Sequence, residues 1–294
     1  MRISILLTCI LWVAAPALGT ELLVVQSVRD VSATELLKSV TRAVAADVEL
    51  LVLSDYAEVD LPRIVREEQP DVILAVGEGA FKATGKIRGV PVVAVMALSL
   101  GGNRSLPVNV TGIEIRIDPA RYMTLFKALG VKRIGVLYDP AQSGAYLAKA
   151  RHAADQAGIE LALRPAKTPR EGLKELASLK GNASDALWLI SDPASVSPLN
   201  LEAAFIFSLE QTKPVISYSG EHLSMGATVA LEPEWSRMGL QAGELVTRLL
   251  EGAKPRDISI QPPRGFSLKS NDTVLTHLGI NGGALEKLFP RTRK

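Results

Sequence analysis

One pattern occurs twice along this 294-residue chain. From Asp71 to Met96, an apolar run is followed by a small polar corner, a helix-like stretch, and a proline that opens a second apolar run. The same order returns from Asp185 to Tyr218, with a longer helix-like stretch. Ligands of open α/β sheets bind beyond the carboxyl ends of the strands. Two copies of this unit therefore predict two similar α/β lobes with a ligand cleft between them.

Short apolar runs alternate with helical stretches along both halves of the chain. Such runs are typical of parallel strands that are covered on both faces. In the first half we expect strands at 22–26, 48–53, 72–76 and 92–96, with helices at 33–45, 62–67 and 80–87. In the second half we expect strands at 133–138, 159–163, 186–190, 215–218 and 228–231, with helices at 143–157, 171–179 and 199–211. The predicted fold class is α/β, with two Rossmann-like, doubly wound lobes.

A loop rich in glycine, serine and asparagine at 98–107 leads into an apolar run at 110–113, where we place the boundary between the lobes. The N-terminal lobe then spans 20–112 and the C-terminal lobe 113–232. The remaining chain predicts a helix at 235–250, strands at 258–260 and 266–268, and two short helices. We expect residues 233–262 to complete the first lobe and residues 263–294 to complete the second.

The first 19 residues have the features of a secretory signal peptide. Arg2 precedes the apolar run 5–15, and Ala17-Leu18-Gly19 offers the small residues of a cleavage site. An anchoring helix is the alternative, but this run is shorter than the ~20 residues that a bilayer requires, and Pro16 interrupts it. We therefore expect cleavage after Gly19 and a periplasmic location.

The cysteine content and the net charge limit which disulfides and which partners the mature protein can have. The only cysteine, Cys9, lies inside the expected signal peptide, so the mature chain can form no disulfide. The formal net charge is +2, with positive and negative residues interspersed. The sequence contains no basic cluster of the kind that binds nucleic acid or an anionic membrane, so neither partner is expected.

Motifs for catalysis are missing. The glycines of 79–86 do not have the spacing of a phosphate-binding loop, and no G-x-S-x-G motif is present. His152, His222 and His277 have no paired spacing for zinc. Glu78, Asp192 and Glu232 could form an acid/base pair across a cleft, which leaves a hydrolase as the weaker alternative. We expect no cofactor and no metal, and favour binding over catalysis.

The corner formed by Gly77, Glu78 and Gly79 is the first candidate for ligand binding. Glycines allow a ligand to approach the backbone, and the start of a helix attracts a carboxylate. The carboxylate of Glu78 would attract an ammonium group instead, so the corner suits a zwitterion such as an amino acid. The alternative is a tight turn in which Glu78 only complements the helix dipole.

Polar corners in the second half are further candidates. Ser191, Asp192 and Ser195 form both a helix-start signature and a polar cluster at a strand end, so Asp192 caps a helix, binds a ligand amine, or does both. After the next strand, an aromatic ring, a hydroxyl and a carboxylate follow one another in Tyr218, Ser219 and Glu221.

Three further positions complete the predicted site. Ser99, after the strand at 92–96, is the counterpart of Ser219 in the first lobe. Gly112 and Glu232 lie at expected crossings between the lobes and are candidate hinge residues. Trp235 is expected in the core.

Several segments, taken in order, resemble the ABC-transporter substrate-binding proteins of the tryptophan/tyrosine-type group. They are Asp71–Gly77, Pro91–Val93, Asn109–Gly112, Lys132–Tyr138, Asp185–Trp188, Lys213–Ile216 and Leu278–Ile280. The resemblance implies a periplasmic type I binding fold that delivers a small molecule to a membrane permease powered by an ATPase. It also implies ligand contacts from Gly77 to Gly79 and from Ser99, Ser191, Asp192 and Ser219.

Two segments depart from the group's pattern. Residues 26–31 are shorter and lack the expected small polar residues, and 98–102 does not keep the Thr-Asp-Pro pattern. We therefore expect a monomeric solute-binding protein that closes around a small polar or zwitterionic, amino-acid-like molecule. The alternative is a periplasmic sensory or regulatory partner with the same fold.

Overall fold

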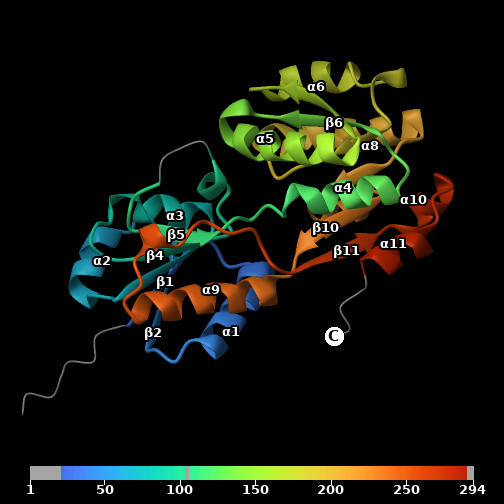
Figure 1. Cartoon of the computed structure of the whole chain (residues 1–294). Coiled ribbons are helices and arrows are strands. Elements are labelled where there is room, and N and C mark those ends of the chain that lie inside the picture. The colour runs from blue at the N-terminus through green and yellow to red at the C-terminus, as the bar shows by residue number, and fades with distance from the viewer. Residues whose placement is uncertain (1–20, 103–105, 290–294) are drawn as a thin grey trace, which may run out of the picture.

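The computed structural model describes residues 21–102 and 106–289, so the predicted signal peptide lies outside the described residues. Two lobes, each with its own sheet and its own covering helices, make up the described chain (Figure 1). The predicted fold class, with two doubly wound α/β lobes, is confirmed.

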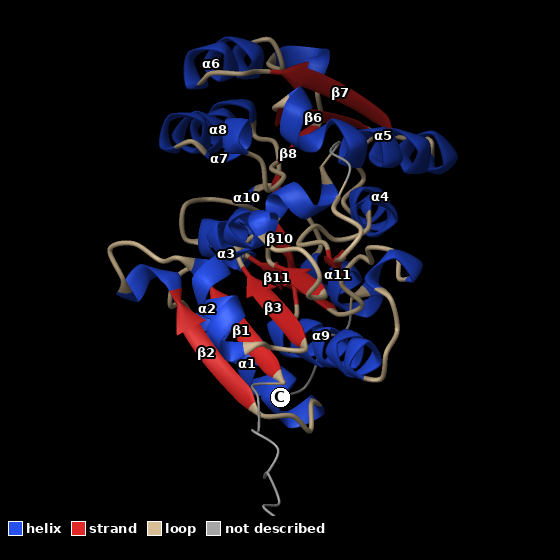
Figure 2. Ribbon diagram, turned by 90° about the vertical axis from the view of Figure 1, so that its left-hand side faces the viewer, coloured by secondary structure: helices blue, strands red, loops and turns tan. Residues whose placement is uncertain are grey.

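The first sheet is entirely parallel, with the strand order β2-β1-β3-β4-β5. Its strands are β1 (Leu22–Gln26), β2 (Val48–Val52), β3 (Val72–Val76), β4 (Val92–Val95) and β5 (Val110–Ile113). Figure 2 shows β2, β1 and β3 side by side. Every residue of β1, β3 and β4 is buried, because helices cover both faces of the sheet.

Alternate residues of these strands enter two separate cores. Leu22 and Val24 of β1 pack with α1 (Val31–Ala43) and α9 (Trp235–Leu250). Leu23 and Val25 pack on the other face, with α2 (Leu61–Glu68) and α3 (Glu78–Ala83). The chain thus returns from the second lobe to place α9 on the first sheet.

The second sheet has the strand order β11-β10-β9-β8-β6-β7, and only β11 is antiparallel to its neighbour. Its strands are β6 (Arg133–Tyr138), β7 (Glu160–Pro165), β8 (Ala186–Trp188), β9 (Val215–Ser217), β10 (Val229–Pro233) and β11 (Phe266–Ser270). One face is covered by α4 (Pro119–Ala128), α5 (Pro140–Ala157), α10 (Asp272–His277) and α11 (Gly282–Leu288). The other is covered by α6 (Pro169–Ala177), α7 (Pro193–Val196) and α8 (Pro198–Gln211).

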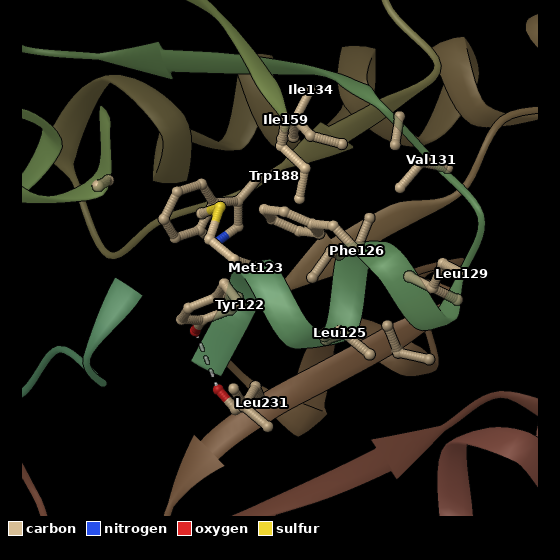
Figure 3. Packing of buried hydrophobic residues seen from close by; sticks show 14 of the residues in the cluster. Tyr122, Met123, Leu125, Phe126, Leu129, Val131, Ile134, Ile159, Trp188 and Leu231 are labelled. Atoms are coloured by element: carbon tan, nitrogen blue, oxygen red, sulfur yellow. Dashed lines mark hydrogen bonds between the residues drawn. The ribbon is translucent and has the colours of Figure 1, made fainter. Parts of the chain in front are cut away.

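Trp188 is the centre of the core on the α4 side of this sheet. Its ring centroid lies 4.6 Å from that of Tyr122, and Phe126 meets it edge-on at 5.4 Å. Figure 3 shows Tyr122, Met123 and Phe126 of α4 gathered at Trp188. This cluster fixes α4, and with it the segment that enters the second lobe.

Three segments of the described chain cross between the lobes: 114–118, 233–235 and 261–265. The first and third lie together, because Glu114 donates its N–H to the carbonyl of Gln261 at 2.8 Å, and Gln261 donates to Gly112 at 3.1 Å. Crossing segments bound to each other restrict the lobes to hinge-like motion.

One expected strand is not formed, and one helix was not expected. Residues 258–260 form no strand; a short 3-10 helix, η6 (Pro255–Asp257), precedes Ile258, and only Gln261 makes a bridge, to Ile113. Helix α4 was not predicted, although Asp118 caps it through Ala120 N–H and Pro119 opens it. No helix in the described ranges has both the length and the apolar character that a membrane span requires.

Candidate functional site

A cavity of about 530 Å³ lies between the two lobes. The first lobe contributes the start of α1, Met96 just after β4, and Trp235 at the start of α9. The second contributes α4, α5, β10 and the residues that follow β8 and β9. The crossing at 114–118 contributes residues 115–117, and the crossing at 233–235 contributes Pro233. The cavity therefore lies at the carboxyl ends of parallel strands, where open α/β sheets bind ligands.

Apolar and aromatic side chains make up much of the cavity wall: Tyr122, Tyr146, Ile190, Tyr218, Leu231 and Trp235. The Tyr122 hydroxyl donates to the Leu231 carbonyl at 3.2 Å, and the Tyr146 hydroxyl donates to the Ile117 carbonyl at 2.9 Å. Burial raises the pKa of both phenols, so both remain neutral donors. Their hydroxyls are thus used in hydrogen bonds within the protein, whereas their rings form a surface suited to the apolar part of a ligand.

Arg116 brings a positive charge into this wall. Its side chain is 6% exposed, and its Nε and Nη2 donate to the Ser191 carbonyl at 3.2 and 3.1 Å. Nη2 also donates to Ser143 Oγ at 3.0 Å, and the guanidinium lies 5.4 Å from the centroid of the Tyr146 ring. Burial lowers the pKa of Arg116, but a guanidinium stays charged at neutral pH.

Sequence reasoning missed Arg116. The residue stands on the crossing after β5, between the buried Ile117 and the half-buried Ile115, immediately before the Asp118-Pro119 helix start. An arginine within an apolar segment that leads to a helix cap was the signal that could have identified it. Lys and Arg are rarely buried without a partner or a role.

Three carboxylates line the same cavity. Glu232 forms an ion pair with Lys269, and Asp30 caps α1 by accepting from Ala33 N–H at 2.7 Å. Glu221, in the 3-10 helix η5 (Gly220–Leu223), is exposed. The cavity thus combines one buried cation with acidic groups on its rim.

Five of the predicted residues line this cavity: Ser191, Tyr218, Ser219, Glu221 and Glu232. Glu232 lies in β10, next to the crossing that leads to α9. Trp235 packs against the core of the first lobe, as expected; it is half-buried and also lines the cavity.

Asp192 and Ser195 do not reach the cavity, because both side chains are buried and satisfied within the second lobe. Asp192 is fully buried; it accepts from Ala194 N–H at 2.8 Å, from Asp139 N–H at 3.0 Å and from the Ser143 hydroxyl. Burial raises the pKa of Asp192, despite these hydrogen bonds. Ser195 donates to the Leu137 carbonyl. Of the interpretations left open for Asp192, helix capping is the one that the structure shows.

The corner at Gly77, Glu78 and Gly79 is also absent from the cavity wall. Ser27 Oγ accepts from Ala80 N–H at 2.8 Å, so part of the helix start is satisfied inside the first lobe. The Glu78 carboxylate accepts from Ser99 N–H at 3.1 Å and pairs with Lys82 at 3.2 Å. Burial opposes ionisation of Glu78, but these contacts outweigh it and lower its pKa.

Gly112 lies within β5 rather than in a crossing. A Cβ atom there would lie 2.0 Å from the carbonyl oxygen of Ala94 on β4. The close approach of two strands therefore requires this glycine, whatever its part in lobe motion.

The fold and the sequence both match known proteins. The family model described as ABC transporter substrate binding protein matches residues 24–285. A Streptococcus pneumoniae ABC domain in complex with L-Trp has a TM-score of 0.65 and 18% identity, over 91% of this chain and 98% of that chain. A conserved domain protein from Vibrio cholerae has a TM-score of 0.65 and 20% identity, over 91% and 97% of the two chains.

A Clostridium difficile substrate-binding protein with adhesive properties, in its ligand-free, open structure, has a TM-score of 0.64 and 19% identity, over 89% and 95%. The search of curated protein sequences produced no match. The family model covers most of the chain, and the structural matches share its two-lobed fold. This chain is a member of the ABC transporter substrate-binding protein family.

Proposed function

We propose that this protein is the periplasmic solute-binding component of an ABC importer, secreted by a signal peptide that is cleaved after Gly19. In this proposal it captures a small zwitterionic, amino-acid-like molecule by closing its lobes and presents it to a permease driven by an ATPase. The observation that carries the proposal is the interlobe cavity, which is lined by one buried guanidinium, aromatic rings and acidic groups.

The composition of the wall supports a zwitterion with an apolar body. Tyrosine rings and aliphatic side chains favour an apolar group, Arg116 favours an anion, and Glu221 favours an ammonium group. The structurally similar Streptococcus pneumoniae domain in complex with L-Trp is consistent with such a ligand.

Lobe closure follows from the distribution of the contacts. A ligand shifts an equilibrium only through its different affinities for the two states. Residues from both lobes and from the crossings line this cavity, so a ligand that contacts all of them stabilises the closed arrangement.

A thermal-shift screen of amino acids, short peptides and sugars tests the proposal. A true ligand at 100 times its Kd stabilises the folded state by about 2.7 kcal/mol, so the melting temperature must rise with ligand concentration. Glu221→Gln should weaken the response to an amino acid, whereas Glu58→Gln, on an exposed loop of the first lobe, should not. A screen in which no solute raises the melting temperature would contradict the proposal.

The transport step needs its own assay. Uptake of the best solute into cells that carry this protein, its permease and its ATPase should stop when the gene for the binding protein is deleted. Unchanged uptake after deletion would favour the sensory role over transport.

A further inference from the structure

We propose that Arg116 is the ligand's anion anchor: the ligand carries a carboxylate, which Arg116 binds from one side and the start of α1 binds from the other when the lobes close. This inference rests on the proposed function and adds the two protein groups that hold the carboxylate and the way in which they couple it to closure. It also moves the anion site away from the Gly77–Gly79 corner.

The first observation is the unbalanced charge of Arg116. Its guanidinium is buried, yet it makes no ion pair within the described chain; its hydrogen-bond partners are neutral, namely the carbonyls of Ser191 and Gln142 and the Ser143 hydroxyl. The carboxylates of Asp192, Glu114 and Glu78 attract the guanidinium electrostatically, but none forms an ion pair with it, and the hydrogen-bonded link to Asp192 runs through the Ser143 hydroxyl. Burial of a cation is costly unless an anion or several acceptors compensate it. A ligand carboxylate would supply the missing anion.

The second observation concerns which donors of Arg116 are already used. Nε and Nη2 bind the second lobe, and Nη1 makes no hydrogen bond to any described residue. Arg116 lines the cavity, and in this proposal its Nη1 is the donor that binds the ligand. The bonds to Ser191 and Ser143 fix the orientation of the guanidinium before a ligand arrives.

The third observation is on the opposite wall. Residues 30–32, the first turn of the 13-residue helix α1, line the same cavity. The first N–H groups of a helix have no intrahelical partner, and Asp30 takes only that of Ala33. The N–H groups of Val31 and Ser32 therefore remain for an anion, which the helix dipole also favours. Asp30 reduces this preference, but its carboxylate is turned to the helix as the cap.

These two walls belong to different parts of the protein. Arg116 is bonded to the second lobe, whereas α1 belongs to the first. A carboxylate held between them makes contacts in the closed arrangement that the open arrangement lacks. The anion, rather than the apolar body alone, would then drive closure.

Matched pairs of small molecules test the anchor on the wild-type protein. The probes are L-tryptophan, L-phenylalanine and 3-phenylpropanoate, each compared with its primary amide, in thermal-shift and calorimetric titrations. A charge-assisted hydrogen bond contributes about 1.5–3 kcal/mol. We therefore expect at least one acid to bind and its amide to bind roughly 10- to 100-fold more weakly.

Variants of Arg116 test the residue itself. Arg116→Gln should abolish the preference for acid over amide. The control is Arg121→Gln, because it removes the same charge from an exposed position on α4 outside the cavity. Because loss of a buried arginine can disturb folding, Arg116→Lys is also measured. This variant keeps the charge but loses the forked guanidinium, so it should bind the acid about tenfold more weakly than the wild type does. Circular dichroism and the melting temperature without ligand establish that each variant is folded.

Several results would overturn the inference. They are equal binding of acid and amide, no binding of any of the three acids, or folded Arg116 variants that bind the acid as Arg121→Gln does. A neutral sugar that raises the melting temperature while the acids do not would overturn the anchor and leave the solute-binding function standing. Failure of both the acids and the wider screen would contradict the proposed function as well.

Discussion

The hydroxyl of Ser143 on α5 donates a hydrogen bond to the carboxylate of Asp192, at the start of α7. The same hydroxyl accepts from Nη2 of Arg116 at 3.0 Å. One side chain of the second lobe thus joins a buried carboxylate to the guanidinium that lines the interlobe cavity. Both charged groups depend on Ser143 for their positions.

Ser143→Ala should destabilise the protein. The substitution leaves Oδ2 of Asp192 without its partner in a buried site and removes one of the three acceptors of Arg116 Nη2, which costs about 1–3 kcal/mol of unfolding free energy. Ser224→Ala is the control, because this hydroxyl makes a single bond, to the Glu221 carbonyl, at an exposed position. Urea unfolding measures both, and equal small losses in the two variants would contradict the buried role of Ser143.

Asp192→Asn should change how stability depends on pH. Burial raises the pKa of Asp192 in the folded state, so the folded protein holds this proton to higher pH than the unfolded chain does. The wild type is therefore most stable relative to the variant below the unfolded pKa, about 3.9, and loses that advantage as the pH rises through the raised value. Urea unfolding of both proteins between pH 4 and 8 measures the difference. An advantage of the wild type that grows with pH would contradict this account.

His222, behind the cavity wall, should make the stability depend on pH in the opposite direction to Asp192. Burial lowers its pKa, although Glu221 opposes the shift. Its Nδ1 lies 2.7 Å from Ser217 Oγ, and the ring of Tyr218 meets it edge-on at 5.3 Å. The folded state thus disfavours protonation, so the stabilisation is complete above the unfolded pKa of about 6.5 and is lost as the pH falls through the lowered value.

The corresponding measurement compares the wild type with His222→Asn. Between pH 8 and pH 5 the unfolding free energy of the wild type should fall relative to that of the variant. Parallel curves over this range would show that burial of His222 does not disfavour its charged form.

Gly112→Ala separates a packing role from a hinge role. A Cβ atom 2.0 Å from the Ala94 oxygen forces β5 away from β4, so the variant should lose at least ~2 kcal/mol of unfolding free energy. Gly85→Ala, where a Cβ atom meets no other atom within 4 Å, should stay within about 0.5 kcal/mol of the wild type. If Gly112→Ala kept its stability and lost only ligand-induced closure, Gly112 would be a hinge.

Much of the fold could be predicted from the sequence because buried parallel strands leave a strong local pattern. The uniformly apolar runs of β1, β3 and β4 are examples, and each strand lies within one residue of its expected range. Helix α4 escaped prediction because its apolar residues face a core built mainly from distant segments, with Trp188 at its centre. The cap at Asp118 and the proline at Pro119 were the local signals of its start.

The site was harder to predict because ligand contacts depend on which strand ends face the other lobe. Tyr218, Ser219 and Glu221 follow β9 and line the cavity, whereas Ser99 follows β4 and instead donates its N–H to Glu78. Asp192 and Ser191 are neighbours in sequence, yet only Ser191 reaches the cavity. No local pattern distinguishes a cap from a ligand contact, and the role of Arg116 depends on tertiary contacts with Ser143 and Ser191.

The central claim is that the two lobes close around a solute in the cavity. The most direct test is the distance between two spin labels, one at the exposed Glu58 of the first lobe and one at the exposed Lys174 of the second. The labels are attached to cysteines introduced at these positions, because the mature chain has no cysteine of its own if the predicted cleavage occurs. Double electron–electron resonance is recorded with and without the solute that raises the melting temperature most in the screen of amino acids, peptides and sugars. The account predicts a shift to one shorter, narrower distance distribution at saturation. An unchanged distribution with the solute bound would contradict it.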